Sequence, residues 1–174
     1  GLAHSLGLSD PTPEQLSALV DGRGMKEAIA KRMLNKPLYR AAAMVAANEA
    51  DIMVAGADSP TRRVIEAASI AIGLDEGVHM PSSFFLMCFP DGRELIFADC
   101  AVNVSPNSDE LLSVAMASDN TAQRLLGMSN VAMLSFSTGA SGSGESVDLV
   151  REAAEAAGYI GPIQADAALN ATIA

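Results

Sequence analysis

The densest group of side chains able to do chemistry lies in the segment 136–144, which reads FSTGASGSG. Its glycines allow backbone N–H groups to approach a ligand closely, and a following helix would add partial positive charge at its N-terminus. Together with the hydroxyl groups, these backbone N–H groups and the helix N-terminus suit an oxyanion such as phosphate. We therefore predict an anion-binding loop made by Ser137, Thr138, Gly139, Ser141, Gly142, Ser143 and Gly144. The alternative is a flexible surface loop with ordinary capping residues, because Gly/Ser runs are common in loops.

Known nucleotide motifs do not fit this loop. A P-loop needs G-x-x-x-x-G-K-[ST], whereas residues 139–146 read G-x-x-x-x-G-E-S. Glu145 stands where a lysine would neutralise phosphate charge, which argues against an ordinary NTPase. The glycine order also differs from the dinucleotide fingerprint G-x-G-x-x-G.

Hydrolase and metal chemistry are poorly supported. A serine-hydrolase elbow needs G-x-S-x-G, but the residue two positions after Ser141 is Ser143. A Ser–His pair would have to rely on His79, since the other histidine, His4, lies near the start of the sequence. No His/Cys/carboxylate group has the spacing of a metal site, so no metal is expected.

Charge is unevenly distributed along the chain. The net charge is −10, yet the first 63 residues carry eight basic and seven acidic side chains. An acidic chain without a basic stripe argues against nucleic-acid binding. The basic side chains of the first part are a second candidate anion site, or simply a solvated helix face. They are Arg23, Lys26, Lys31, Arg32, Lys36, Arg40, Arg62 and Arg63.

Hydrophobic periodicity and turn signals predict alternating helices and short strands. Expected helices cover 13–22, 25–34, a segment from Pro37, 60–73, 107–126, 145–157 and a segment from Asp166. Expected strands cover 51–56, 83–89, 94–99, 130–135 and 159–164, the second and third forming a hairpin. This order favours one folding unit of α/β class, a three-layer sandwich with a largely parallel sheet plus an antiparallel hairpin. The Ser/Gly loop then follows the carboxyl end of a strand, where ligands collect in such sheets.

The two cysteines indicate a compartment. Cys88 and Cys100 flank the hairpin turn and are out of register for a disulfide, which fits reduced thiols in the cytoplasm. The sequence has no run of about 18 apolar residues and no charged-then-apolar leader, so neither a membrane span nor a signal peptide is expected.

Several collinear segments resemble the phosphate acetyltransferase and phosphate butyryltransferase family. They are LSFSTGASGSGESVDLVREA, NKPLYRAAAMVAANEADIMVAGA, PSSFFLMCFPDGRELIFADCAVN and IQADAALN, within residues 24–170. The resemblance implies reversible acyl transfer between coenzyme A and phosphate, with acetyl-CoA or CoA and phosphate or acyl phosphate as substrates, no bound cofactor and a homodimer. It corresponds mainly to the family's inserted second domain, so we expect a domain at 23–174 preceded by an extension or partial first domain at 1–22.

The resemblance also implies what is missing. The family's L-S-R-G motif does not occur, so its Ser-Arg pair would lie beyond Ala174 and the catalytic residues stay unassigned. The family usually has an arginine where this chain has Glu66, and Arg62 and Arg63 lie on about the same helix face as replacements. We expect a fragment lacking part of the active site or, alternatively, a non-catalytic CoA/phosphate-binding or dimerisation module of the same fold.

Five further polar residues lie in or near the matched segments. We expect structural roles for them, as turn or strand-end groups and, for the last, as a side chain that orients a neighbouring helix. They are Ser82, Ser83, Asp99, Asn103 and Asp166.

Overall fold

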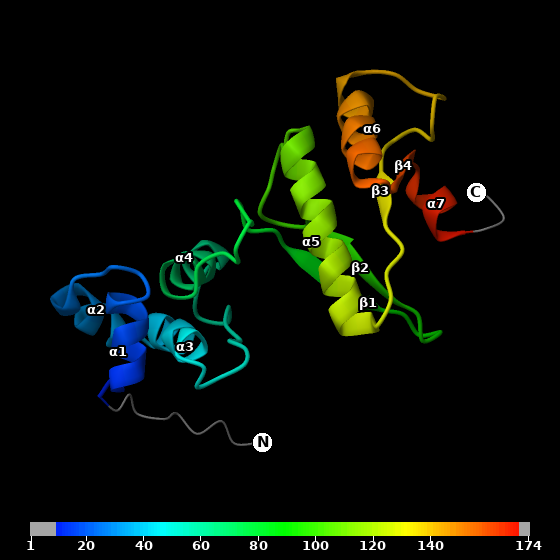
Figure 1. Ribbon diagram of the computed structural model, residues 1–174. Coiled ribbons are helices and arrows are strands. Elements are labelled where there is room, and N and C mark those ends of the chain that lie inside the picture. The colour runs from blue at the N-terminus through cyan, green and yellow to red at the C-terminus, as the bar shows by residue number, and fades with distance from the viewer. Residues whose placement is uncertain (1–9, 171–174) are drawn as a thin grey trace. The chain divides into compact units, whose positions relative to one another are not determined.

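The computed structural model describes residues 10–170, which divide into two compact units (Figure 1). The first unit ends at Glu76 and the second begins at Gly77. The sequence predicts one domain over residues 23–174, and the division after Glu76 falls inside it. The limits at residues 22 and 23 stay a prediction.

The first unit is helical, and local signals explain where its helices begin. Thr12 caps the first helix through a capping box with Gln15, and Pro13 occupies the first turn, as the sequence predicts. Pro37 likewise opens the third helix. The helices are α1 (Pro13–Val20), α2 (Glu27–Leu34), α3 (Pro37–Ala46) and α4 (Thr61–Ala71).

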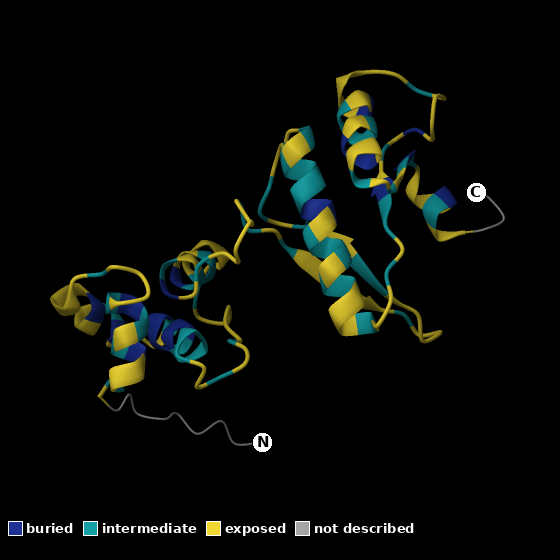
Figure 2. Ribbon diagram, viewed as in Figure 1, coloured by how far each residue is buried: buried dark blue, intermediate teal, exposed yellow. Residues whose placement is uncertain are grey.

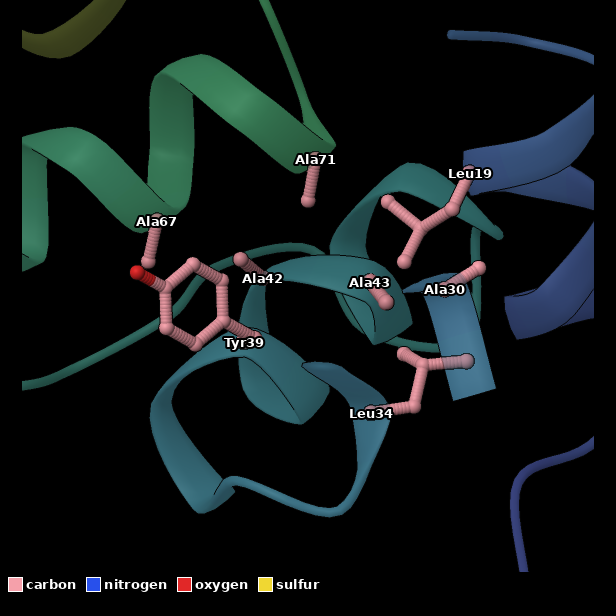
Figure 3. Packing of buried hydrophobic residues seen from close by; sticks show 8 residues of the cluster. All are labelled: Leu19, Ala30, Leu34, Tyr39, Ala42, Ala43, Ala67 and Ala71. Atoms are coloured by element: carbon pink, nitrogen blue, oxygen red, sulfur yellow. The ribbon is translucent and has the colours of Figure 1, made fainter. Parts of the chain in front are cut away.

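Small side chains dominate the core of the first unit, which lets its helices approach closely. Leu19 and Leu34 are fully buried at 1% and 0% exposure, and Tyr39 extends from α3 beside Ala67 of α4 (Figure 3). Alanine contributes most of the remaining buried positions, at Ala30, Ala42, Ala43, Ala67 and Ala71.

The strand predicted over 51–56 is wrong, because this segment has no regular structure. Ile52 is 75% exposed and Val54 is 90% exposed, so neither apolar side chain is covered. A strand needs a neighbour to pair its backbone groups, and none of the described residues pairs with this segment.

The second unit contains every strand of the described chain. β1 (Phe84–Cys88) and β2 (Glu94–Ala98) form the predicted antiparallel hairpin, while β3 (Ala132–Leu134) pairs in parallel with β4 (Ile160–Ile163). The unit's helices are α5 (Ser108–Leu126), α6 (Glu145–Ala157) and α7 (Ala165–Leu169).

The long helices of the second unit begin and end at the predicted signals. Asn107 and Glu110 form the capping box of α5. Gly127 and Gly158 end α5 and α6 in the left-handed conformation, which glycine adopts without a Cβ penalty.

The core of the second unit lies where α5 and α6 meet β3 and β4. Figure 2 colours the buried residues of this unit dark blue. Met133 of β3 packs there with Ala153 and Ala154 of α6. A Cβ at Gly161 would lie 2.8 Å from Met133 Cβ, so the parallel pair needs glycine at this position. The predicted α/β class is confirmed, and its strands form two separate two-stranded sheets among residues 10–170.

We predict that Leu34→Ala lowers the free energy of unfolding by about 2–5 kcal/mol, because it removes a fully buried side chain and leaves a cavity. Urea denaturation followed by circular dichroism measures this change. Val54→Ala is the matched control, since its side chain is 90% exposed, and should shift the value by less than about 0.5 kcal/mol. Equal losses in the two variants would contradict the assigned core.

Candidate functional site

The start of the Ser/Gly loop is attached to β4. The Ser135 amide donates to Ile163 O at 2.9 Å, and the Gly139 amide donates to Pro162 O at 2.8 Å. The Gln164 amide donates to Thr138 Oγ1 at 3.1 Å. The loop therefore leaves the carboxyl end of β3 along a defined path and continues to α6 (Figure 1).

A turn within the loop engages one of the predicted hydroxyl groups. Ser141 Oγ donates to Thr138 O at 2.7 Å and accepts from the Thr138 amide at 3.2 Å. The Ser141 amide also donates to Thr138 O, at 3.1 Å. The Ser141 hydroxyl thus stabilises the loop, whereas Ser143 is exposed.

Ser137 is the hydroxyl that the loop leaves unsatisfied. The residue is 5% exposed, and its buried Oγ has no hydrogen-bond partner among residues 10–170. A Cβ at Gly142 would lie 2.7 Å from Ser137 Cβ and 2.8 Å from Ser137 Oγ, so only glycine allows the loop to fold over this serine. A buried hydroxyl without a partner costs about 1–3 kcal/mol, which a ligand oxygen would recover.

The N-terminus of α6 adds free backbone donors next to this serine-containing loop. Its N-cap Gly144 has φ 134° and gives no side-chain cap. Within the described chain, the amides of Glu145 and Ser146 have no hydrogen-bond partner, as expected for the first turn of a helix. Glu145 places a carboxylate in the same turn. An anion bound here would accept hydrogen bonds from amides and hydroxyls and would be repelled by this carboxylate.

The two predicted arginines lie on α4, in the first unit. Arg62 and Arg63 are both exposed. On the same helix Glu66 accepts a hydrogen bond of 3.0 Å from Tyr39 Oη. Burial and the Glu66 carboxylate raise the pKa of Tyr39, and the Arg63 guanidinium acts in the opposite direction. Glu66 therefore supports the α3–α4 contact, and anion binding by either arginine stays a prediction.

Asp99 organises the end of the hairpin, in the structural role expected for it. Its carboxylate accepts hydrogen bonds from the Ser83 hydroxyl, the Asn103 side chain and the amides of Ala101, Val102 and Asn103. Asn103 Nδ2 also donates to Pro81 O at 3.0 Å. Burial alone would raise the pKa of Asp99, but these donors outweigh it and lower the pKa to about 2.

A second carboxylate network was not anticipated from the sequence. Tyr159 Oη donates to Asp119 Oδ2 at 2.8 Å, and the Ser129 hydroxyl donates to Asp119 Oδ1. Burial and this hydrogen bond raise the pKa of Tyr159 to about 12. The contact joins α5 to the residue before β4, and a separation of 40 positions leaves no local signal for it.

Residues 10–170 lack the features of two other kinds of site. No group of three or more His, Cys, Asp or Glu side chains is arranged to hold a metal ion. None of the helices in this part of the chain is both long and apolar enough to cross a membrane. Cys88 and Cys100 are both free thiols.

Comparisons with known proteins agree with one another. A family model described as "Phosphate acetyl/butaryl transferase" matches residues 9–174. The phosphate acetyltransferase of Nitratidesulfovibrio vulgaris is 41% identical over 160 residues, covering 87% of this chain and 22% of the relative. That of Thermoanaerobacterium thermosaccharolyticum is 41% identical over 165 residues, covering 87% of this chain and 50% of the relative.

A solved structure extends the similarity to the fold. The EutD phosphotransacetylase from Staphylococcus aureus matches with a TM-score of 0.82 and 31% identity, covering 98% of this chain and 57% of that one. The chain thus spans about half or less of the length of the curated relatives named above.

We predict that Asp99→Asn destabilises the protein by about 1–3 kcal/mol at neutral pH, because the amide group cannot accept from all the surrounding donors. In the wild type, the lowered pKa of Asp99 means that the ionised carboxylate stabilises the fold above the usual value of 3.8 and that this contribution is lost as pH falls through about 2.

The variant should therefore lose less stability than the wild type between about pH 5 and about pH 2 in urea denaturation. Glu152→Gln, a change at an exposed position of α6, is the control and should follow the wild-type curve. Parallel acid losses in Asp99→Asn and the wild type would show that Asp99 does not carry this dependence.

Proposed function

The chain belongs to the phosphate acetyl/butaryl transferase family, and on that premise we propose that it serves reversible acyl transfer between coenzyme A and phosphate. In this reaction acetyl-CoA and phosphate give CoA and acetyl phosphate. The observation that carries the proposal for this chain is the buried Ser137 hydroxyl, without a partner among residues 10–170, in a loop that leads to free amides of α6. The Ser/Gly loop is the proposed phosphate-binding element.

The loop has hydrogen-bond donors of the kind that the departing phosphate needs. When a CoA thiolate attacks acetyl phosphate, negative charge develops on the departing phosphate and needs fixed donors. Ser137 Oγ and the amides of Glu145 and Ser146 are such donors, held by the pairing of β3 with β4. We propose Arg62 and Arg63, on α4 of the first unit, as an anion-binding pair of their own, since a guanidinium can clamp phosphate oxygens. The thiol must also lose a proton, and no described residue is assigned as that base.

The finer properties of the protein follow from the family and are part of the proposal. CoA is a substrate and not a resident cofactor, and no bound metal takes part. The acting form is a homodimer in the cytoplasm, where the thiols of Cys88 and Cys100 stay reduced.

A second candidate is a binding or dimerisation module that has kept the fold without the chemistry. It is favoured by Glu66, which the resemblance places at the position of the family's usual arginine and which accepts a hydrogen bond from Tyr39. This candidate predicts phosphate or CoA binding without turnover.

Ser137→Ala separates a ligand-binding hydroxyl from a structural one. Isothermal titration with inorganic phosphate should show affinity falling about tenfold, since a hydrogen bond to a charged group is worth about 1.5–3 kcal/mol. The free energy of unfolding should be unchanged or higher, because the variant removes a buried hydroxyl that has no partner in the described chain. Ser113→Ala on α5 is the control, because this half-buried hydroxyl already donates to Asp109 O at 3.0 Å, and it should preserve the phosphate affinity.

Acyl transfer is followed in the same samples as acetyl-CoA formation from acetyl phosphate and CoA. Turnover that falls with Ser137→Ala supports the enzyme, whereas phosphate binding without turnover, in the full-length protein as well as in this chain, supports the binding module. Unchanged phosphate affinity in Ser137→Ala, or no phosphate binding by the wild type, would overturn the proposed role of the loop.

A further inference from the structure

Glu145 is a charged side chain that the proposed reaction does not use, although it borders the Ser/Gly loop. It is exposed at the first position of α6, directly after the N-cap Gly144. Within residues 10–170, its carboxylate takes part in no hydrogen bond and no ion pair. The other acidic side chain of this first turn, Asp148, is paired with Arg151. The negative charge of Glu145 is therefore uncompensated beside the proposed anion site.

Basic side chains are scarce in the second unit. Residues 77–170 contain no lysine, and none of their arginines lies in the loop 136–144 or in the first turn of α6. Arg151 is already engaged by Asp148. The other arginines are Arg93 in the hairpin turn and Arg124 in the last turn of α5. The donors that the second unit offers to an anion at the loop are thus neutral hydroxyl and amide groups.

The elements packed on α6 add negative charge at this end of the unit. β3 and β4 have no titratable side chain. α5 packs on α6 and runs in the same direction, so its first turn with Asp109 and Glu110 lies at the same end (Figure 1). Asp119 accepts its hydrogen bonds near the C-terminal end of α6. Asp166 lies in the first turn of α7, after β4, and His79 lies in the segment before the hairpin.

Oxyanions differ in whether they keep a proton near neutral pH. A phosphate group exchanges its second proton in this range, whereas sulfate stays a dianion. A carboxylate repels a dianion about twice as strongly as a monoanion at the same distance. A protonated phosphate oxygen can also donate a hydrogen bond to a carboxylate, and sulfate has no proton to donate.

We infer that Glu145 makes the Ser/Gly loop selective for an oxyanion that keeps a proton, so that the loop binds phosphate in preference to sulfate. The inference rests on the proposed phosphate-binding role of the loop and assigns its selectivity. The feature that points to a ligand is the Ser137 hydroxyl, which is 5% exposed and has no partner among residues 10–170. This hydroxyl and the amides of α6 suit either anion, and Glu145 supplies the difference.

Glu145→Gln tests the inference in the 174-residue chain by isothermal titration with inorganic phosphate and with sodium sulfate at one ionic strength. The wild type should bind phosphate more tightly than sulfate at about pH 6, and the preference should shrink toward about pH 8 as phosphate loses its proton. Glu145→Gln should lower the ratio of phosphate affinity to sulfate affinity about fivefold at the lower pH, because a dianion is relieved of more repulsion than a monoanion. Its pH dependence should also be flatter.

Two further variants control for charge and for the helix start. Glu155→Gln removes the same charge from an exposed position of α6 about 15 Å further along the helix, beyond the Debye length, and should keep the wild-type ratio. Glu145→Asp keeps the charge in the first turn and should keep the preference for phosphate.

The outcomes separate this inference from the proposed function. Phosphate binding that depends on Ser137, with an affinity ratio that Glu145→Gln leaves unchanged, would overturn the role of Glu145 and leave the loop standing as an anion site. Equal wild-type affinities for phosphate and sulfate at both pH values would do the same. A wild type that binds neither anion would overturn both.

Discussion

Backbone hydrogen bonds between the end of β3 and β4 hold the start of the Ser/Gly loop, and the rest of the candidate site depends on them. The amides of Ser135 and Gly139, which flank Ser137 in the sequence, donate to carbonyls of β4. Ser137 therefore lies buried under the loop and is not exposed to solvent. Gly142 can then approach Ser137 closely because it has no side chain. The same parallel pairing places β3 against α6, whose first turn supplies the free amides.

The site therefore combines two kinds of donor with different origins. The amides of the α6 first turn are free because every helix leaves its first N–H groups without intrahelical partners. The Ser137 hydroxyl is free because the surrounding loop excludes water without offering an acceptor or donor in exchange. Such an arrangement costs free energy by itself and stabilises a bound oxyanion, which is how a preorganised site differs from a flexible loop.

Local signals in the sequence were sufficient for most elements of the fold. The capping box at Asn107 and the terminal glycine at Gly127 identify α5, because both depend on residues within one or two turns. The segment 51–56 was predicted wrongly, since an apolar run becomes a strand only when another segment pairs with it. The loop's composition predicts an anion site. It does not show that Ser137 Oγ lacks a partner within residues 10–170 while Ser141 Oγ donates to Thr138 O, because this difference depends on how the loop packs.

The central claim is that the Ser/Gly loop binds an oxyanion through Ser137 and the first turn of α6. Amide chemical shifts recorded during a titration with inorganic phosphate test it most directly, because each donor reports separately. The account predicts saturable shifts concentrated at Ser137, Glu145 and Ser146, with little change along the β1–β2 hairpin. Shifts confined to other parts of the chain, or none at the loop at saturating phosphate, would contradict it.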